Sequence, residues 1–298
     1  MKLFSGFIFL FIFFSNTVFS ADSQQSELLK IFHAMQNNQV DLLEGELLHI
    51  QSDVGDIRLH ADIYAINHYD FSELITKLST PSNWCQFITL HLNIKACVYQ
   101  MGSEKSLVFY AGRKFYEPAE SAYELRYKFS VKKRQKDYFK LVLSAKSGPF
   151  STSNYLIELE LLQIGENVLM HFSLSYDSSF SSRLGSNVYL STMGADKIGF
   201  SQVENNEGKK EFIKGVEGII ERNAMRYFLA LNVYFEYGAV TEKLLPAWFD
   251  ATEQYHDQLH EVEKSDYLRD KKQEFNQQLE MQKRLDTGQG LFEENTSD

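Results

Sequence analysis

The segment His256-Asp257-Gln258-Leu259-His260 places two histidines four residues apart. On a helix this spacing brings both imidazoles to one face, as in the HExxH zinc peptidases. Asp257 stands where those enzymes carry the glutamate that activates water, and its side chain is one methylene shorter. No clear third ligand follows His260. We therefore interpret the two side chains as solvated histidines and predict no metal and no cofactor.

Other catalytic signatures are missing from the sequence. The chain has no Gly-x-Ser-x-Gly for acyl transfer and no Gly-x4-Gly-Lys-Ser/Thr loop for phosphate. Its 298 residues are 44% hydrophobic and 23% charged, an ordinary globular composition. The net charge of -10 disfavours a nucleic-acid partner. We predict no catalytic residues and expect a binding protein rather than an enzyme.

Four cations could anchor an acidic ligand. Arg113 and Lys114 lie at the end of a predicted strand, while Arg222 and Arg226 lie one helical turn apart near the start of a predicted long helix. If that helix lies across the sheet, the four groups converge, and arginine can hold a carboxylate or phosphate through two hydrogen bonds. The alternative is that they pair with carboxylates of the chain itself: Glu117, Glu217 or Glu221.

A further polar group occurs in the segment 91–97. His91, Asn93 and Lys95 alternate with apolar residues, so the three side chains share one face of a predicted strand. Most such faces are simply hydrated, and the alternative is that His91 helps to bind a ligand. No carboxylate lies close to His91 in the sequence, so an acid-base role has no support.

The elements that must position these residues are mainly strands. Between residues 90 and 176 polar and apolar residues alternate almost throughout, which predicts half-buried strands. The short turns between them predict antiparallel pairing. Six strands are expected here: 91–100, 105–114, 121–131, 137–147, 153–164 and 167–177. Two strands at 46–50 and 57–66, a helix at 26–36 and short helices after Asp70 and Pro81 precede them.

The C-terminal half is predicted to be more helical. An apolar pattern over 216–237, ended by Gly238, indicates a long buried helix. Before it we expect a helix from Leu184 toward Met193 and a hairpin over 199–214. Two mainly polar helices follow at 246–264 and 265–285, with Ser265 or Asp266 as a cap, and they would pack by a narrow seam onto the core or a protein partner. An acidic, polar tail is expected to be disordered.

The order of these elements resembles the helix-grip fold of the START-like (SRPBCC) superfamily over residues 42–237. That resemblance implies a curved antiparallel sheet wrapped around a long C-terminal helix, with a cavity that commonly holds a lipid, sterol or polyketide. The segments Asn83-Trp84-Cys85 and Gly112-Arg113-Lys114, with 91–97 and 221–227, are also similar to an uncharacterised group of secreted proteobacterial proteins.

We therefore predict an α+β protein that binds a hydrophobic or amphipathic small molecule in such a cavity. The expected apolar wall consists of Tyr123, Leu125, Tyr127, Phe129, Phe172, Leu174, Tyr227 and Leu231. The expected polar anchors are Arg113, Lys114, Arg222, Arg226 and His91. The alternatives are a structural or partner-docking envelope protein, or a hydrolase or cyclase using the same cavity. The expected organisation is a signal peptide (1–20), an N-terminal helical segment (21–41), the helix-grip domain (42–238), a helical appendage (239–285) and the tail (286–298).

Residues 1–20 have the order of a cleavable secretory signal. Lys2 precedes an apolar run over 3–14, and Val18 and Ser20 occupy the -3 and -1 positions before Ala21. The alternative is an uncleaved N-terminal anchor. No second apolar run of about 18 residues follows, so we expect no transmembrane anchor after cleavage near Ser20 and a periplasmic or secreted location.

The two cysteines fit that location. Export to an oxidising compartment favours a disulfide between Cys85 and Cys97. Two buried free thiols are the main alternative. A zinc site that includes His91, midway between them, has a spacing unlike the familiar zinc motifs.

Cleavage of the signal can be tested directly. We expect the chain isolated from its native cell envelope to begin at Ala21, because small residues at -3 and -1 define the cleavage site. N-terminal sequencing or intact mass measures this. A chain that still carries Met1 or Lys2 would contradict the prediction.

Overall fold

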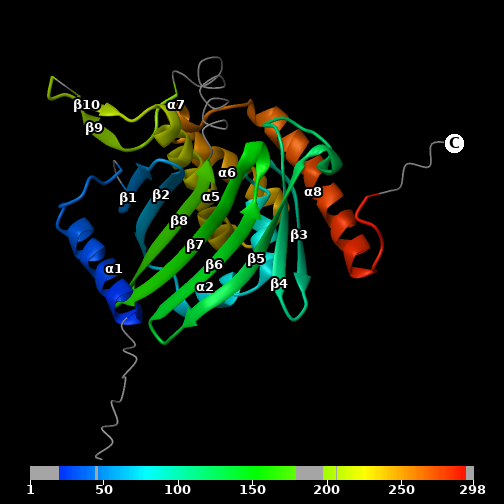
Figure 1. Cartoon of the computed structure of the whole chain (residues 1–298), viewed down its shortest axis with the longest axis horizontal. Coiled ribbons are helices and arrows are strands. Elements are labelled where there is room, and N and C mark those ends of the chain that lie inside the picture. Colours follow the sequence, from blue (N-terminus) through cyan, green and yellow to red (C-terminus); the bar gives the residue numbers. More distant parts are fainter. Residues whose placement is uncertain (1–19, 44–45, 179–196, 206, 293–298) are drawn as a thin grey trace, which may run out of the picture.

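A computed structural model describes residues 20–43, 46–178, 197–205 and 207–292 of the chain. In this described part, eight strands form one antiparallel sheet in the order β1-β2-β8-β7-β6-β5-β4-β3 (Figure 1). The strands are β1 (Leu48–Val54), β2 (Arg58–Asn67), β3 (Ile94–Met101), β4 (Lys105–Ala111), β5 (Tyr123–Arg134), β6 (Tyr138–Ser147), β7 (Thr152–Ile164) and β8 (Asn167–Ser178). The predicted α+β class and antiparallel meander are confirmed. The helix expected from Leu184 lies outside the described residues.

Strands β2 and β8, which are far apart in the sequence, pair as neighbours in this strand order. Their pairing sets large buried side chains side by side, since Phe172 of β8 lies opposite Ile63 of β2 and Leu159 of β7. On the other half of the sheet, Leu125 lies opposite Phe109. The period-two pattern therefore collects the apolar side chains on one face of the sheet.

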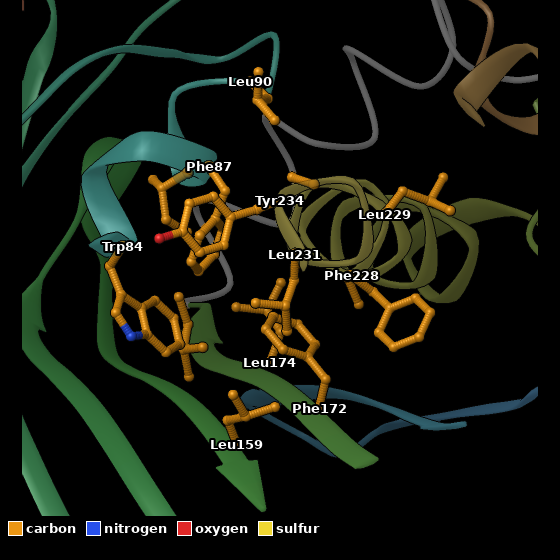
Figure 2. Packing of buried hydrophobic residues seen from close by; sticks show 14 of the residues in the cluster. Trp84, Phe87, Leu90, Leu159, Phe172, Leu174, Phe228, Leu229, Leu231 and Tyr234 are labelled. Atoms are coloured by element: carbon orange, nitrogen blue, oxygen red, sulfur yellow. The ribbon is translucent and has the colours of Figure 1, made fainter. Parts of the chain in front are cut away.

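Helix α5 (Gly215–Tyr237) packs against this apolar face, contacting β1, β2 and β8. Figure 2 shows Leu231 of α5 pointing toward Phe172 and Leu174 of β8. Helix α3 (Pro81–Ile88) fills the space beside α5, where the Phe87 ring lies 5.5 Å from that of Tyr234. Complete wrapping of the sheet around α5, as in a helix-grip fold, stays a prediction.

The N-terminal helices and the hairpin predicted from the sequence are present. In α2 (Phe71–Leu78) the Asp70 side chain caps the N-terminus by accepting from the backbone N–H of Glu73 at 2.7 Å, as predicted. Helix α1 (Ser20–Gln36) covers the opposite face of the sheet, where Leu28 and Phe32 pack near Leu162. A small hairpin, β9 (Gln202–Glu204) and β10 (Lys210–Phe212), precedes α5.

The helices after α5 are α6 (Thr241–Glu253), the single turn α7 (His256–Leu259) and α8 (Lys264–Asp286). We predicted that this helix begins at Pro246, but α6 begins five residues earlier, at Thr241. The additional turn buries Leu244 and Leu245. Glu263, rather than Ser265 or Asp266, occupies the N-cap position of α8 and makes no side-chain cap. Within the described residues, no helix is long and apolar enough to cross a membrane.

Helix α8 packs along β3, the last strand of the sheet. Its glutamines bond the backbone of that edge strand: Gln278 Oε1 accepts from the Cys97 N–H at 2.7 Å, and Gln282 bonds both the N–H and the carbonyl of Tyr99. An apolar side chain of this helix, Leu279, is 61% exposed. The helix presents polar side chains because its partner is an unpaired strand edge.

Two further details differ from expectation. Strand β3 begins at Ile94, so His91 lies in the preceding turn, and both His91 and Lys95 are buried rather than hydrated. In the described part of the tail, Leu291 and Phe292 pack against a cluster that contains Tyr110 and Met281. The disorder expected for the tail is therefore not found at these two residues.

The predicted disulfide is present. Cys85 of α3 and Cys97 of β3 are bonded, with their Cα atoms 5.1 Å apart. The bridge holds α3 against the sheet next to the segment that carries His91.

Removal of this bridge should destabilise the protein. The bonded cysteines are 12 positions apart, and the chain-entropy account assigns such a loop roughly 3 kcal/mol. We expect the double variant Cys85→Ser, Cys97→Ser to lose about that free energy of unfolding in urea titrations under non-reducing conditions. Equal stability of the variant and the oxidised wild type would contradict this.

Candidate functional site

The expected apolar wall lies between the sheet and α5, but most of it is packed core. Leu125, Tyr127, Phe129, Phe172, Leu174 and Leu231 are all at most 5% exposed. Figure 2 shows three of them, Phe172, Leu174 and Leu231, pointing toward one another between β8 and α5. Tyr123, at the start of β5, is 41% exposed. Tyr227 is only partly buried.

Tyr227 belongs to a group that we call the tyrosine cluster: Tyr127 of β5, Tyr155 of β7, Tyr176 of β8 and Tyr227 of α5. Tyr155 and Tyr176 stack with ring centroids 4.9 Å apart. A Cβ on Gly148 would come within 2.2 Å of the Tyr155 ring, so the glycine provides its space. Tyr155, Tyr176 and Tyr227 keep part of their surface accessible although they pack against the main core.

The hydroxyls of the tyrosine cluster influence one another. Burial raises the pKa of Tyr227, and Tyr155 and Tyr176 raise it further. Burial also raises the pKa of Tyr127, and the nearby Tyr227 and Tyr155 raise it further. Burial raises the pKa of Tyr155 to about 12, although its hydrogen bond with Thr152 opposes the shift. All four hydroxyls therefore stay protonated near neutral pH and can donate hydrogen bonds.

His91 lies against this cluster. Its ring stacks on Tyr227 with centroids 4.4 Å apart. Burial, then the charges of Arg226, Lys271, Lys95 and Lys114, lower the pKa of His91 well below its usual value, so the ring is neutral.

The tautomer of His91 follows from its contacts. Nδ1 accepts from the backbone N–H of Asn93 at 3.1 Å, so the proton of the neutral ring is on Nε2. In the described structure this buried Nε2 has no hydrogen-bond partner. His91 thus offers a buried N–H donor beside the partly buried Tyr227.

Two of the four predicted cationic anchors do converge, but on a carboxylate of the chain. Lys114 Nζ lies 2.6 Å and Arg226 Nη2 2.8 Å from the carboxylate of Glu261, and Lys197 joins them at 2.8 Å. Burial alone would raise the pKa of Glu261, but Arg226 and Lys114 outweigh it and lower the pKa to about 2. The internal carboxylate occupies the position that we had expected for an acidic ligand.

The other two anchors lie apart from this group. Arg113 pairs with Glu117 at 2.8 Å, which is the internal pairing considered above. Arg222 Nη1 donates to the carbonyls of Lys197 and Ile198. Glu221, another expected partner, instead accepts from the backbone N–H groups of Phe200 and Ser201.

A buried ion network fixes the turn that carries His91. Lys95 and Lys271 lie 2.8 and 2.7 Å from the two oxygens of Glu274. Lys95 also donates to the carbonyl of Leu92, and Lys271 to those of His91 and Ile94. Burial lowers the pKa of Lys271 to about 8, although Glu274 opposes the shift. The backbone around His91 is therefore held by α8.

The opposite face of the sheet carries a separate charged network. His171 of β8 bonds Glu160 through Nδ1 at 3.0 Å and Asp62 through Nε2 at 2.8 Å. His60 Nε2 lies near both Asp62 and Ser173. Because the acid and the hydroxyl approach the same nitrogen, His60 cannot relay a proton between them as in a Ser-His-Asp triad.

Several of these residues were not foreseen. Tyr155 and Tyr176 continue the alternation of β7 and β8, so the same periodicity that indicated Phe172 could have indicated them. The spacing of Lys271 and Glu274 could have indicated that ion pair, but the contacts of Glu261 with Arg226 and of Glu274 with Lys95 carry no sequence signal, since these partners lie far away in the chain. Glu261 is 35 positions from Arg226, and Glu274 is 179 positions from Lys95.

No protein-family model and no curated protein matches the chain. Among solved structures, it is similar to CalU16 from Micromonospora echinospora, with 8% identity over 73% of this chain and 100% of that one and a TM-score of 0.32. A conserved protein from Geobacillus kaustophilus shows 15% identity over 44% and 84% of the two chains, with a TM-score of 0.29. Likenesses this distant carry no functional argument.

The His171 network should make stability depend on pH. Burial alone would lower the pKa of His171, but Asp62 and Glu160 outweigh it and raise the pKa from 6.5 to about 9. A raised pKa means that the imidazolium stabilises the fold fully below pH 6.5 and loses this contribution as the pH rises through 9. We expect the loss to reach about 3 kcal/mol.

Urea unfolding between pH 6.5 and 9 checks this, with His171→Gln as the test variant and exposed His68→Gln as its control. As the pH rises from 6.5 to 9, the free energy of unfolding of the wild type and of His68→Gln should fall more than that of His171→Gln. Parallel curves for all three proteins would show that His171 does not carry the dependence.

Proposed function

We propose that the chain binds a small amphipathic molecule between the sheet and α5, at the tyrosine cluster. The observation that carries this proposal is the Nε2–H of His91, which is buried and has no acceptor in the described structure. An unsatisfied buried donor costs roughly 1–3 kcal/mol. An oxygen of a bound molecule would remove that cost.

The surroundings favour a ligand with an apolar body and a polar oxygen. Tyr155, Tyr176 and Tyr227 are only partly buried, and aromatic surface with a few polar groups is the usual form of a small-molecule site. The positive charges of Arg226, Lys271, Lys95 and Lys114 that lower the pKa of His91 also favour negative charge on that oxygen. A carboxylate or enolate end fits this field best.

Binding is favoured over hydrolysis or cyclisation by the state of His91. Its Nδ1 is occupied by the N–H of Asn93, and its Nε2 already carries the proton. Neutral His91 therefore has no free lone pair with which to act as a general base. The described residues around it contribute neutral hydroxyls rather than an activated nucleophile.

We also infer that binding takes place after export and that sheet and helix form a helix-grip. The secretory pattern of residues 1–20 and the Cys85–Cys97 disulfide support an oxidising location. The packing of α5 on β1, β2 and β8 supports the helix-grip arrangement.

A fluorescent long-chain fatty acid tests the proposed site. We expect saturable binding at one site per chain, reduced roughly ten-fold in His91→Phe, because phenylalanine keeps the stack on Tyr227 but removes the donor. Tyr227→Leu should weaken binding as well. Tyr64→Phe is the matched control, since this tyrosine packs on the opposite face, in the cluster with α1.

Thermal unfolding of each variant separates binding from folding. If His91→Phe binds as tightly per folded molecule as the wild type, His91 is a structural residue and the proposed site is wrong. Native mass spectrometry of the protein from its own host provides a second measurement. It should show a retained small molecule that His91→Phe holds less.

A further inference from the structure

The junction of α6 and α7 brings together three groups with metal-ligand chemistry. Glu253 ends α6, His256 begins α7 and His260 follows it. His260 Nδ1 lies 3.0 and 3.1 Å from the two oxygens of Glu253, and His256 Nε2 lies 4.0 Å from Glu253 Oε2. One ligand atom from each residue lies within 4.8 Å of the others. We propose that Glu253, His256 and His260 bind a zinc-class divalent metal ion.

The distances suit such an ion. Zinc bonds imidazole nitrogen at about 2.0–2.1 Å and carboxylate oxygen at about 2.0–2.2 Å, so tetrahedral ligand atoms lie roughly 3.3 Å apart. The separations of 3.0 and 4.0 Å to Glu253 bracket this value. The His256 ring is stacked on that of His260, with centroids 4.4 Å apart and an interplanar angle of 15°. Because a metal ion lies in the plane of each imidazole that binds it, the exposed His256 side chain must turn out of this stack to bind the ion.

The ligand types select the class of metal. Calcium and magnesium require mainly oxygen ligands, whereas two imidazoles with one carboxylate suit zinc and its first-row neighbours. No clear third ligand follows the histidine pair in the sequence. The third group precedes the pair, at Glu253, in the order Glu-x2-His-x3-His.

Contacts on either side of the site hold the ligands in place. Leu259, between the two histidines, is 2% exposed. Lys197 Nζ donates to the carbonyl of His260 at 2.7 Å, and the Tyr255 ring packs on Phe200. The side chain of His256 is 63% exposed and that of His260 is 32% exposed. The ion can therefore enter from solvent and keep a position for water or another ligand.

The test uses the full chain after removal of metals with a chelator. Zinc is added in competition with a chromogenic chelator, and cobalt serves as a spectroscopic probe of the coordination shell. We expect one tightly bound zinc per chain and visible cobalt bands typical of tetrahedral coordination. His256→Ala and Glu253→Gln should each weaken zinc binding by at least about ten-fold.

His68→Ala removes an exposed histidine outside this site and should leave zinc affinity unchanged. Because His256 is largely exposed, His256→Ala should fold, and circular dichroism checks this. Equal zinc affinity of the wild type and the double variant His256→Ala, His260→Ala would overturn the proposal. Loss of affinity in His68→Ala to the same degree would also overturn it. The test is independent of fatty-acid binding, so the two proposals can fail separately.

Discussion

The buried ion network of Lys95, Glu274 and Lys271 is the interaction on which the candidate site depends. Edge strand β3 would otherwise expose its backbone groups, which invites pairing with another chain. Helix α8 supplies polar side chains to that edge, with both lysines bonded to Glu274 and to backbone carbonyls. Buried charges are tolerated when they are paired and hydrogen-bonded in this way. Removing one partner would leave an uncompensated charge in the core.

The same network determines the position of His91. Four backbone carbonyls of this turn accept hydrogen bonds from buried side chains. Lys271 donates to His91 and Ile94, Lys95 donates to Leu92, and the Tyr267 hydroxyl donates to Leu90. A turn held at successive carbonyls has little freedom, so the His91 ring is fixed on Tyr227. The C-terminal helices therefore do more than cover the sheet. They set the geometry of the His91 ring, to which its neighbour Asn93 contributes only one hydrogen bond, at Nδ1.

The regular part of the fold could be predicted from the sequence because its patterns are local. Alternation identified the strands, and the cap of α2 and the end of α5 at Gly238 were confirmed. The extent of helix α8 was predicted closely, but its buried face was not, because that face includes Lys271, Glu274 and Gln278, which apolar periodicity cannot distinguish from a hydrated face. The turn at His91 was predicted to be part of a strand, because the alternation of polar and apolar residues does not show where the strand begins to pair with its neighbour.

The candidate site shows the same division between local and long-range information. Side-chain type identified Arg226 and Lys114 as possible anchors, but only the tertiary structure shows that Glu261 lies between them. A cation bonded to an internal carboxylate gains less from a ligand than a donor that has no acceptor, because the ligand must first replace the existing bond. His91 begins from the opposite state, with a buried N–H that any suitable oxygen would satisfy. That difference in starting state is the physical reason to place the polar end of the ligand at His91 rather than at the arginines.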